Sequence, residues 1–76
     1  MMTLEECLFP INTGKLVWHL RRHLTAILTN ETYEDDDGDL YIKIIKQNGI
    51  SYNANPYYLT LMTPADLLSD YYKYMQ

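Results

Sequence analysis

Cysteine, glycine and long apolar runs are scarce in this chain, and each scarcity excludes a class of protein. Cys7 is the only cysteine, so no disulfide can form within the chain, and a reducing compartment, the cytoplasm, is expected. No apolar run approaches the roughly 20 residues that span a bilayer. The first residues carry acid, whereas a targeting peptide carries base. We therefore expect no membrane partner.

Catalytic motifs are also missing. Cys7 has no flanking signature, and Ser51 and Ser69 lie outside any Gly-x-Ser-x-Gly motif. The three glycines are scattered and form no phosphate-binding loop. We therefore expect that the protein is not an enzyme and has no cofactor.

Two patterns suggest a metal site but lack its full ligand set. His19 and His23 have the spacing of a zinc-binding helix, but Leu20 stands where a zinc protease carries glutamate. The acidic run around Gly38 departs from an EF-hand, because Ile44 stands where the bidentate glutamate belongs. We expect no structural metal, while weak binding of a divalent cation to the acidic run stays open.

The length of 76 residues fits a single domain, 1–76, with one small core. A chain of this size hides only about 60 % of its unfolded surface when it folds. Oligomerisation is a common way for so small a domain to gain buried area. A homodimer, and with it a self-associating structural subunit, is therefore one alternative.

Helix signals dominate the first part of the chain. Thr3 and Glu6 have the spacing of a capping box, which predicts a short helix from Leu4, and Pro10 should end it early. Apolar residues then recur at three- and four-residue spacing, which predicts a principal helix over about 14–29. These residues are Leu16, Val17, Leu20, Leu24, Ile27 and Leu28.

Strand signals follow. Residues 32–35 and 40–46 read as two strands joined by a turn at Asp37-Gly38, and 40–46 shows the alternation of a half-buried strand. Asn48-Gly49 predicts a hairpin with a type I′ turn. Residues 57–62 fit either a further strand or irregular chain.

The end of the chain carries another helix signal. Thr63 as cap, Pro64 at the first helical position and Asp66 three residues after the cap predict a helix over 64–75. The expected fold class is α+β, in the order α-β-β-β-α. It consists of a small antiparallel sheet of three to four strands flanked by an N-terminal and a C-terminal helix.

Negative charge is concentrated in one place. The chain has a net charge of -4, and six of its ten acidic residues lie between Glu31 and Asp39. The rest of the chain, with four acidic residues against six lysines and arginines, has a net charge of +2. Such a field favours a basic protein surface as partner and makes nucleic acid an unfavourable one. An alternative interpretation of the acidic run is a solvated hairpin tip whose charge serves only solubility.

Tyrosine is abundant, with eight residues, which is more than so small a core can bury with every hydroxyl satisfied. Exposed tyrosines are common in protein interfaces, because they offer large contact area at little entropy cost. We therefore expect partner binding through the acidic run and its flanking tyrosines. The predicted binding residues are Glu31, Tyr33, Glu34, Asp35, Asp36, Asp37, Asp39 and Tyr41.

In its size, its single cysteine and the cluster from Glu31 to Asp39, the chain resembles small acidic proteins that bacteriophages encode to disable host replication, transcription, repair or CRISPR nucleases. Several of these anti-CRISPR and other inhibitors are DNA mimics. The resemblance implies a larger host protein as partner, nucleic-acid processing as the inhibited process, and the host cytoplasm as location. It covers no alignable motif, so no residue is assigned from it.

The alternative function is that of a small nucleic-acid-binding regulator. The predicted principal helix would carry a basic face opposite its apolar one, and tyrosines could stack on single-stranded bases beside it. The residues of this face are Lys15, His19, Arg21, Arg22 and His23.

Overall fold

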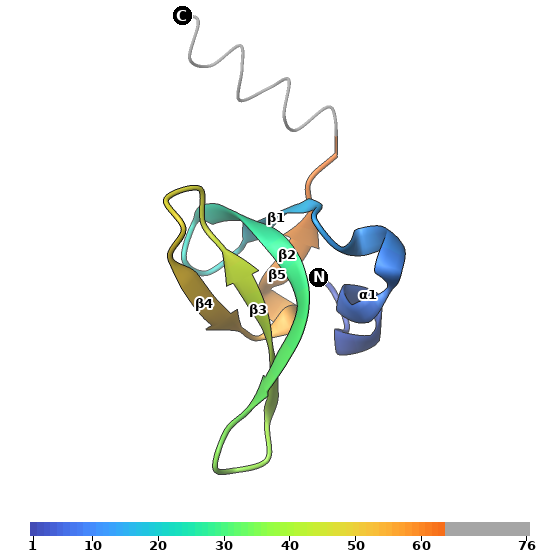
Figure 1. Ribbon diagram of the computed structural model, residues 1–76, viewed down its shortest axis with the longest axis vertical. Helices are drawn as coiled ribbons and strands as arrows, with labels where there is room; N and C mark the ends of the chain where they lie inside the picture. Colours follow the sequence, from blue (N-terminus) through green and yellow to red (C-terminus); the bar gives the residue numbers. More distant parts are fainter. Residues whose placement is uncertain (64–76) are drawn as a thin grey trace, which may run out of the picture.

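The computed structural model describes residues 1–63, whose regular structure is dominated by one antiparallel sheet (Figure 1). The sheet has five strands in the order β4-β3-β2-β1-β5. The strands are β1 (Leu16–His19), β2 (Leu24–Glu34), β3 (Leu40–Ile45), β4 (Ser51–Ala54) and β5 (Leu59–Leu61).

The connections explain this order. Strands β1 to β4 follow one another as a meander, each paired with the next. The 3-10 helix η2 (Pro56–Tyr58) then turns the chain, and Asn55 caps it by accepting a hydrogen bond from the Tyr57 amide at 3.0 Å. As a result β5 pairs with β1, although the two lie far apart in the sequence.

One short helix packs on the sheet. Helix α1 (Leu4–Leu8) contacts β2 and β3, and the 3-10 helix η1 (Pro10–Asn12) follows it. The predicted capping box is confirmed: Glu6 donates its amide to the Thr3 hydroxyl, and Thr3 donates its amide to the Glu6 carboxylate, each at 3.1 Å. The helix ends two residues before Pro10, as the sequence predicts.

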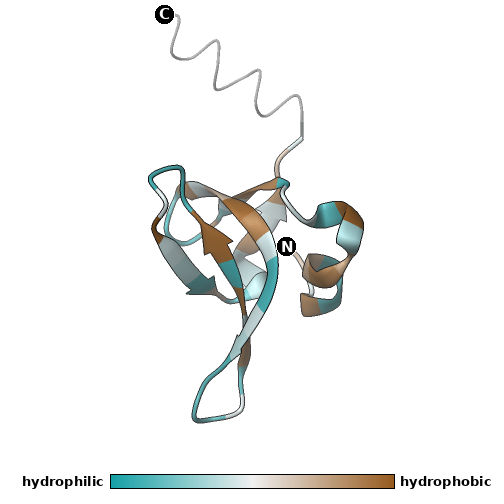
Figure 2. Ribbon diagram, in the orientation of Figure 1, coloured by the Kyte–Doolittle hydropathy of each residue, from teal (hydrophilic) through white to brown (hydrophobic). Residues whose placement is uncertain are grey.

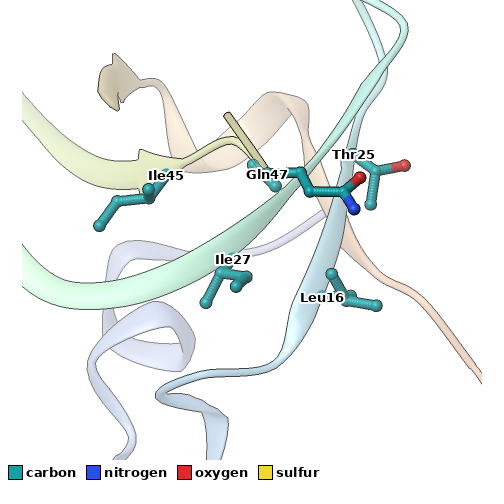
Figure 3. A pocket seen from close by; sticks show the side chains of 6 residues that line it. Leu16, Thr25, Ile27, Ile45 and Gln47 are labelled. Carbon is teal, nitrogen blue, oxygen red and sulfur yellow. The ribbon is translucent and has the colours of Figure 1, made fainter. Parts of the chain in front are cut away.

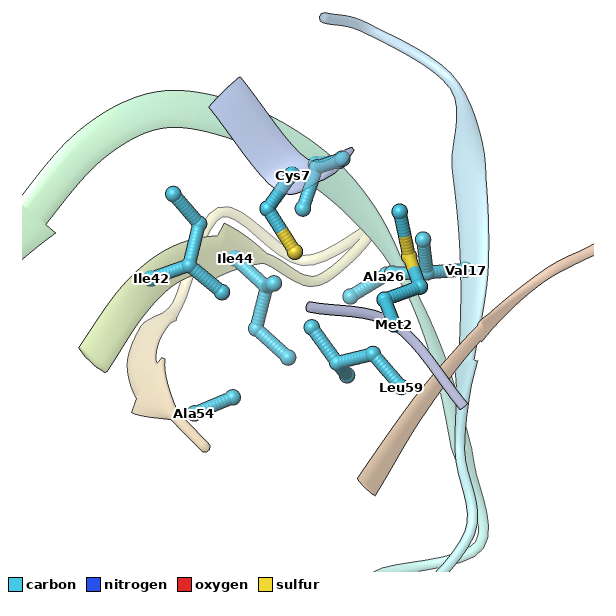
Figure 4. Close-up of a cluster of buried hydrophobic side chains, with 9 residues drawn as sticks. Met2, Cys7, Val17, Ala26, Ile42, Ile44, Ala54 and Leu59 are labelled. Atoms are coloured by element: carbon cyan, nitrogen blue, oxygen red, sulfur yellow. The ribbon is translucent and has the colours of Figure 1, made fainter. Parts of the chain in front are cut away.

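The core lies between α1 and the inner face of the sheet (Figure 4). Alternate residues of the strands point into it, as the pleat requires. Burying one Val, Leu or Ile side chain contributes about 1.5–3 kcal/mol, so this small cluster is the main source of stability. The buried apolar residues are Met2, Cys7, Val17, Ala26, Leu28, Ile42, Ile44, Ala54 and Leu59.

The predicted helix over 14–29 is wrong. Strand β1, a turn at residues 20–23 and the first part of β2 occupy that stretch. Val17, Ala26 and Leu28 face the core, while Leu16 and Ile27 lie on the outer face of the same strands. With apolar residues on both faces, the two-residue alternation is hidden and the spacing imitates a helix.

The predicted α+β fold, three to four strands flanked by two helices in the order α-β-β-β-α, is therefore wrong as well, because residues 1–63 form a five-stranded sheet with one short helix and two 3-10 turns. The predicted strand at 32–35 is the far end of the much longer β2. Residues 57–62 divide between η2 and β5. The predicted helix over 64–75 lies outside the described residues. Within residues 1–63, no helix is long and apolar enough to cross a membrane.

Both predicted turns exist, but the prediction of a type I′ turn at Asn48-Gly49 is wrong. That turn type needs a positive φ at both residues, and of the two only Gly49 has one, at 88°. Lys46 donates its amide to the Ile50 carbonyl, and Gly49 donates its amide to the Lys46 carbonyl. This pattern is that of a three-residue loop with glycine in its left-handed position. The turn at Asp37-Gly38 has the same pattern between Asp35 and Asp39, with Gly38 at φ 85°.

Candidate functional site

The hairpin of β2 and β3 extends beyond the rest of the sheet (Figure 1). Its pairing changes register between Leu28 and Thr32, which marks a β-bulge where the hairpin leaves the body. At the bulge the Thr29 hydroxyl donates to the Lys43 carbonyl at 2.6 Å and accepts from the Glu31 amide at 3.2 Å. One side chain thus replaces ladder hydrogen bonds that the bulge removes.

Asp35 organises the turn at the far end of this hairpin. Its Oδ1 accepts hydrogen bonds from the amides of Asp37 and Asp39, at 3.0 and 2.9 Å. Its Oδ2 accepts the hydroxyl of Tyr41 at 3.0 Å. Both carboxylate oxygens are therefore used within the loop, and Asp35 is only half-exposed.

Tyr41 reflects its acidic surroundings in its pKa. The hydrogen bond to Asp35 raises the pKa of Tyr41 above its usual value of 10.0, and the charges of Asp35, Asp39 and Asp37 raise it further. Tyr33 lies directly opposite Tyr41 on the neighbouring strand, with ring centroids 6.4 Å apart. The two rings form an aromatic base beneath the charged turn.

The remaining carboxylates of the turn stay open to solvent. We call Glu34, Asp36, Asp37 and Asp39 the acidic tip; all four are exposed, and within residues 1–63 no lysine, arginine or histidine forms a salt bridge with them. Glu31 differs, because it pairs with Lys43 at 3.1 Å. Figure 2 shows the hydrophilic end of the hairpin against the apolar strands of the body.

All eight predicted binding residues thus lie in one hairpin, but in different roles. Glu31 pairs with Lys43, Asp35 holds the turn, and Tyr41 donates to Asp35. The acidic tip and Tyr33, whose exposed fraction is 49%, are free to meet another molecule.

Three aspartates of this loop place a carboxylate oxygen each within 4.8 Å of one another: Asp35, Asp37 and Asp39. Divalent cations prefer such oxygen ligands. A cation would, however, compete with the amides and the hydroxyl that already bind Asp35. Asp37 and Asp39 are the two residues of the trio whose carboxylates are not tied to the loop backbone.

The predicted basic helix face does not exist as such, because its residues lie on a strand and a turn. His19 is buried at the end of β1, and its Nδ1 accepts the amides of Arg21 and Arg22 at 3.2 and 3.0 Å. Burial lowers the pKa of His19 below 6.5, and the charge of Arg22 lowers it further. His23 adopts a left-handed φ of 54° and packs edge-on against Trp18, while Lys15 lies at the opposite end of β1.

The two arginines instead stack on two tyrosines of η2 and β4, and the sequence did not predict these pairs. Arg21 lies 5.3 Å from the ring centre of Tyr58, and Arg22 lies 5.2 Å from that of Tyr52. Each contact joins segments about thirty or more residues apart in the chain. Only the abundance of tyrosine hinted at such pairs; no local signal selects them.

Cys7, the one thiol, is fully buried in the core. Burial raises its pKa from 9.0 to about 11, and the neighbouring charge of Glu6 raises it as well. Since the thiolate is the reactive form, the thiol is inert as a nucleophile near neutral pH.

A shallow hollow lies on the outer face of the sheet (Figure 3). Leu16, Ile27 and Ile45 form a row across β1, β2 and β3 at its base, because they are paired in register. Thr25, Ala26 and Gln47 complete its lining, so no charged side chain among residues 1–63 lines it. The hollow is suited to apolar contact, and the described part of the chain supplies no acid or base to it.

Comparison of the chain with protein-family models, with curated proteins and with solved structures found no match. The function of the protein is therefore inferred from the geometry of its site.

Proposed function

We propose that this protein is a small binding module that inhibits a larger, nucleic-acid-processing protein by placing its acidic tip in a basic cleft of that protein. The observation that carries the proposal is the acidic tip itself. Four exposed carboxylates gather on a turn that extends from the body, and none of them is neutralised by a cation within the described part of the chain. Their charge is therefore available to a partner.

The shape of the hairpin supports insertion into a cleft. Asp35 fixes the turn through three hydrogen bonds, so the carboxylates lose little freedom when they bind. Tyr33 and Leu40, exposed by 49% and 47%, flank the tip and can supply the apolar anchors that a charged contact needs. Charge would govern the encounter, and the anchors would prolong the complex.

The first test is capture from a bacterial lysate. Tagged protein is expected to retain nucleic-acid-processing proteins at about 50 mM salt and to release them at about 500 mM, because salt screens exposed charges. For a protein identified in this way, we expect the association rate to fall about a hundredfold or more when all four carboxylates are neutralised. The variant combines Glu34→Gln, Asp36→Asn, Asp37→Asn and Asp39→Asn, and surface plasmon resonance measures the rate.

A matched pair of single substitutions provides the control. Asp36→Asn and Glu5→Gln remove the same charge, the first from the acidic tip and the second from an exposed position on α1. We expect only Asp36→Asn to slow association severalfold. Equal effects of the two substitutions, or recovery of nucleic acid with no protein, would contradict the proposal.

A further inference from the structure

A second surface, distinct from the acidic tip, combines cations with aromatic rings. It begins at Lys46, which follows β3. The Nζ of Lys46 lies 6.0 Å from the ring centre of Tyr52. Arg22 approaches the same ring to 5.2 Å. One tyrosine of β4 thus holds two cations beside its ring.

The same surface continues through the next residue of the turn. Arg21 lies 5.3 Å from the ring centre of Tyr58 and also donates from its guanidinium to the Tyr58 hydroxyl at 3.1 Å. Tyr57 packs edge-on against Tyr58, with ring centroids 5.6 Å apart, and 58% of it is exposed. We call Lys46, Tyr52, Arg22, Arg21, Tyr58 and Tyr57 the aromatic-cationic strip.

The strip is held in place by the fold. His19 accepts the amides of Arg21 and Arg22, and its ring stacks on Tyr58 at 6.0 Å. The Leu20 amide donates to the Tyr58 carbonyl at 2.8 Å, which ties the β1–β2 turn to η2. The guanidinium groups are therefore presented from a braced turn.

The strip also keeps its positive charge. Within residues 1–63 the only salt bridge joins Lys43 to Glu31, so no carboxylate neutralises the three cations of the strip. The acidic tip lies at the end of the β2–β3 hairpin, whereas the strip gathers around the β1–β2 turn, β4 and η2 (Figure 1). The two fields are thus separated by the body of the sheet.

We infer that the aromatic-cationic strip binds single-stranded nucleic acid. The strip offers both groups that a single strand needs: a base can stack on the exposed ring of Tyr57 or on a guanidinium plane, and phosphates can pair with the three cations. A rigid duplex hides the faces of its bases, and an acidic protein segment has none to stack. Binding by the strip does not involve the acidic tip, so its failure would leave the proposed function unaffected, and the reverse also holds.

Fluorescence anisotropy of the full chain with labelled oligonucleotides tests the inference. A thymidine strand of about 12 nucleotides, a length within the range that small binding domains cover, is expected to bind at about 50 mM salt in preference to a duplex of the same length. With three phosphate contacts, the plot of log affinity against log salt should have a slope of about -2.

Two matched pairs of variants locate the binding surface. Arg22→Glu should weaken binding more than tenfold and reduce the salt slope by about 0.7, while Lys15→Glu, the same charge change at an exposed site outside the strip, should do neither. Tyr57→Ala should weaken binding about 5- to 100-fold, the loss expected for one stacked base, while Phe9→Ala, at an exposed aromatic residue outside both surfaces, should leave it unchanged.

Several outcomes would overturn the inference. These are no binding of the single strand at low salt, equal losses from Arg22→Glu and Lys15→Glu, or a preference for duplex. Equally tight binding of a poly-glutamate peptide would show that the strip takes acidic protein segments instead.

Discussion

Asp35 shows how one side chain of an acidic run can serve the fold while its neighbours stay free. Its two oxygens accept two amides and one hydroxyl, so its negative charge is solvated by the loop itself. Hydrogen bonds to a charged acceptor contribute about 1.5–3 kcal/mol. From the sequence, Asp35 was predicted to be a binding residue. The sequence does not show which carboxylates of an acidic run accept hydrogen bonds within the turn and which face solvent.

The coupling between Asp35 and Tyr41 gives a prediction at the same scale. Asp35→Asn removes the charge and the acceptor that raise the pKa of Tyr41, so that pKa should fall back toward 10.0. Ultraviolet titration of tyrosinate measures the change. The interactions that raise the pKa of Tyr41 stabilise the fold below about pH 10, and this stabilisation is lost as pH rises through the folded pKa. The wild type should therefore lose more unfolding free energy at alkaline pH than Asp35→Asn does.

Asp37→Asn is the control, because it removes a charge from the same loop and leaves the hydrogen bond to Tyr41 in place. It should shift the pKa of Tyr41 less than Asp35→Asn does. Equal shifts from the two substitutions would mean that general charge, and not the hydrogen bond, sets the pKa.

His19 is a second polar residue whose role is internal. Its neutral ring accepts two amides through Nδ1 and carries its proton on Nε2. Protonation of Nδ1 would break both hydrogen bonds inside the protein. The pKa of His19 is therefore lower in the folded chain than its ordinary 6.5.

This lowered pKa predicts how stability depends on pH. The unfolded chain takes up a proton first, so the stabilisation due to neutral His19 is complete above about pH 6.5 and is lost as pH falls through the folded pKa. His19→Asn keeps an acceptor near the position of Nδ1 and removes the titration, so it should flatten the fall in unfolding free energy. Chemical denaturation between about pH 4 and 8 measures it.

His23→Asn serves as the comparison, because asparagine tolerates the left-handed backbone that His23 adopts. A slope that flattens with His23→Asn and not with His19→Asn would contradict the assignment.

At the scale of elements, the bulge in β2 depends on Thr29. Its hydroxyl satisfies the Lys43 carbonyl and the Glu31 amide where the ladder is interrupted. Thr29→Val keeps the shape and removes both contacts, so it should lower the unfolding free energy by about 1–2 kcal/mol.

Thr32→Val is the matched control, because Thr32 is exposed beyond the bulge on the same strand. It should change stability by less than about 0.5 kcal/mol. Denaturant titration measures the unfolding free energy of both variants. Similar decreases for the two would contradict the role of the Thr29 hydroxyl at the bulge.

The elements also show what sequence could and could not predict. Local chemistry found the capping box, the β3 strand and the positions of both glycine turns, because each depends on a few neighbouring residues. The prediction of a helix over 14–29 was wrong. Leu16 and Ile27 on the outer face add apolar residues between the inward-facing Val17, Ala26 and Leu28, so the two-residue alternation cannot be seen in the sequence. Neither the closure of β5 on β1 nor the stacking of Arg22 on Tyr52 has a local signal.

At the scale of the whole molecule, the fold gathers basic residues from distant parts of the sequence on a surface away from the acidic run. The acidic tip ends one hairpin, and the cations of the aromatic-cationic strip gather where β4, η2 and the β1–β2 turn meet. Among residues 1–63, the Lys43–Glu31 salt bridge near the bulge is the only ion pair between the two signs of charge. A near-neutral body therefore presents two surfaces of opposite sign in different directions.

The bulge has a further consequence for how this molecule could change over time or be redesigned. Beyond Thr32 the hairpin contributes no side chain to the buried cluster except Ile42, which lies opposite Thr32 itself. Inserting or deleting residues in pairs on both strands past that point preserves which side chains face inward, since strands repeat every two residues. The arm can thus be lengthened, shortened or given a new loop while the body beneath it keeps its packing.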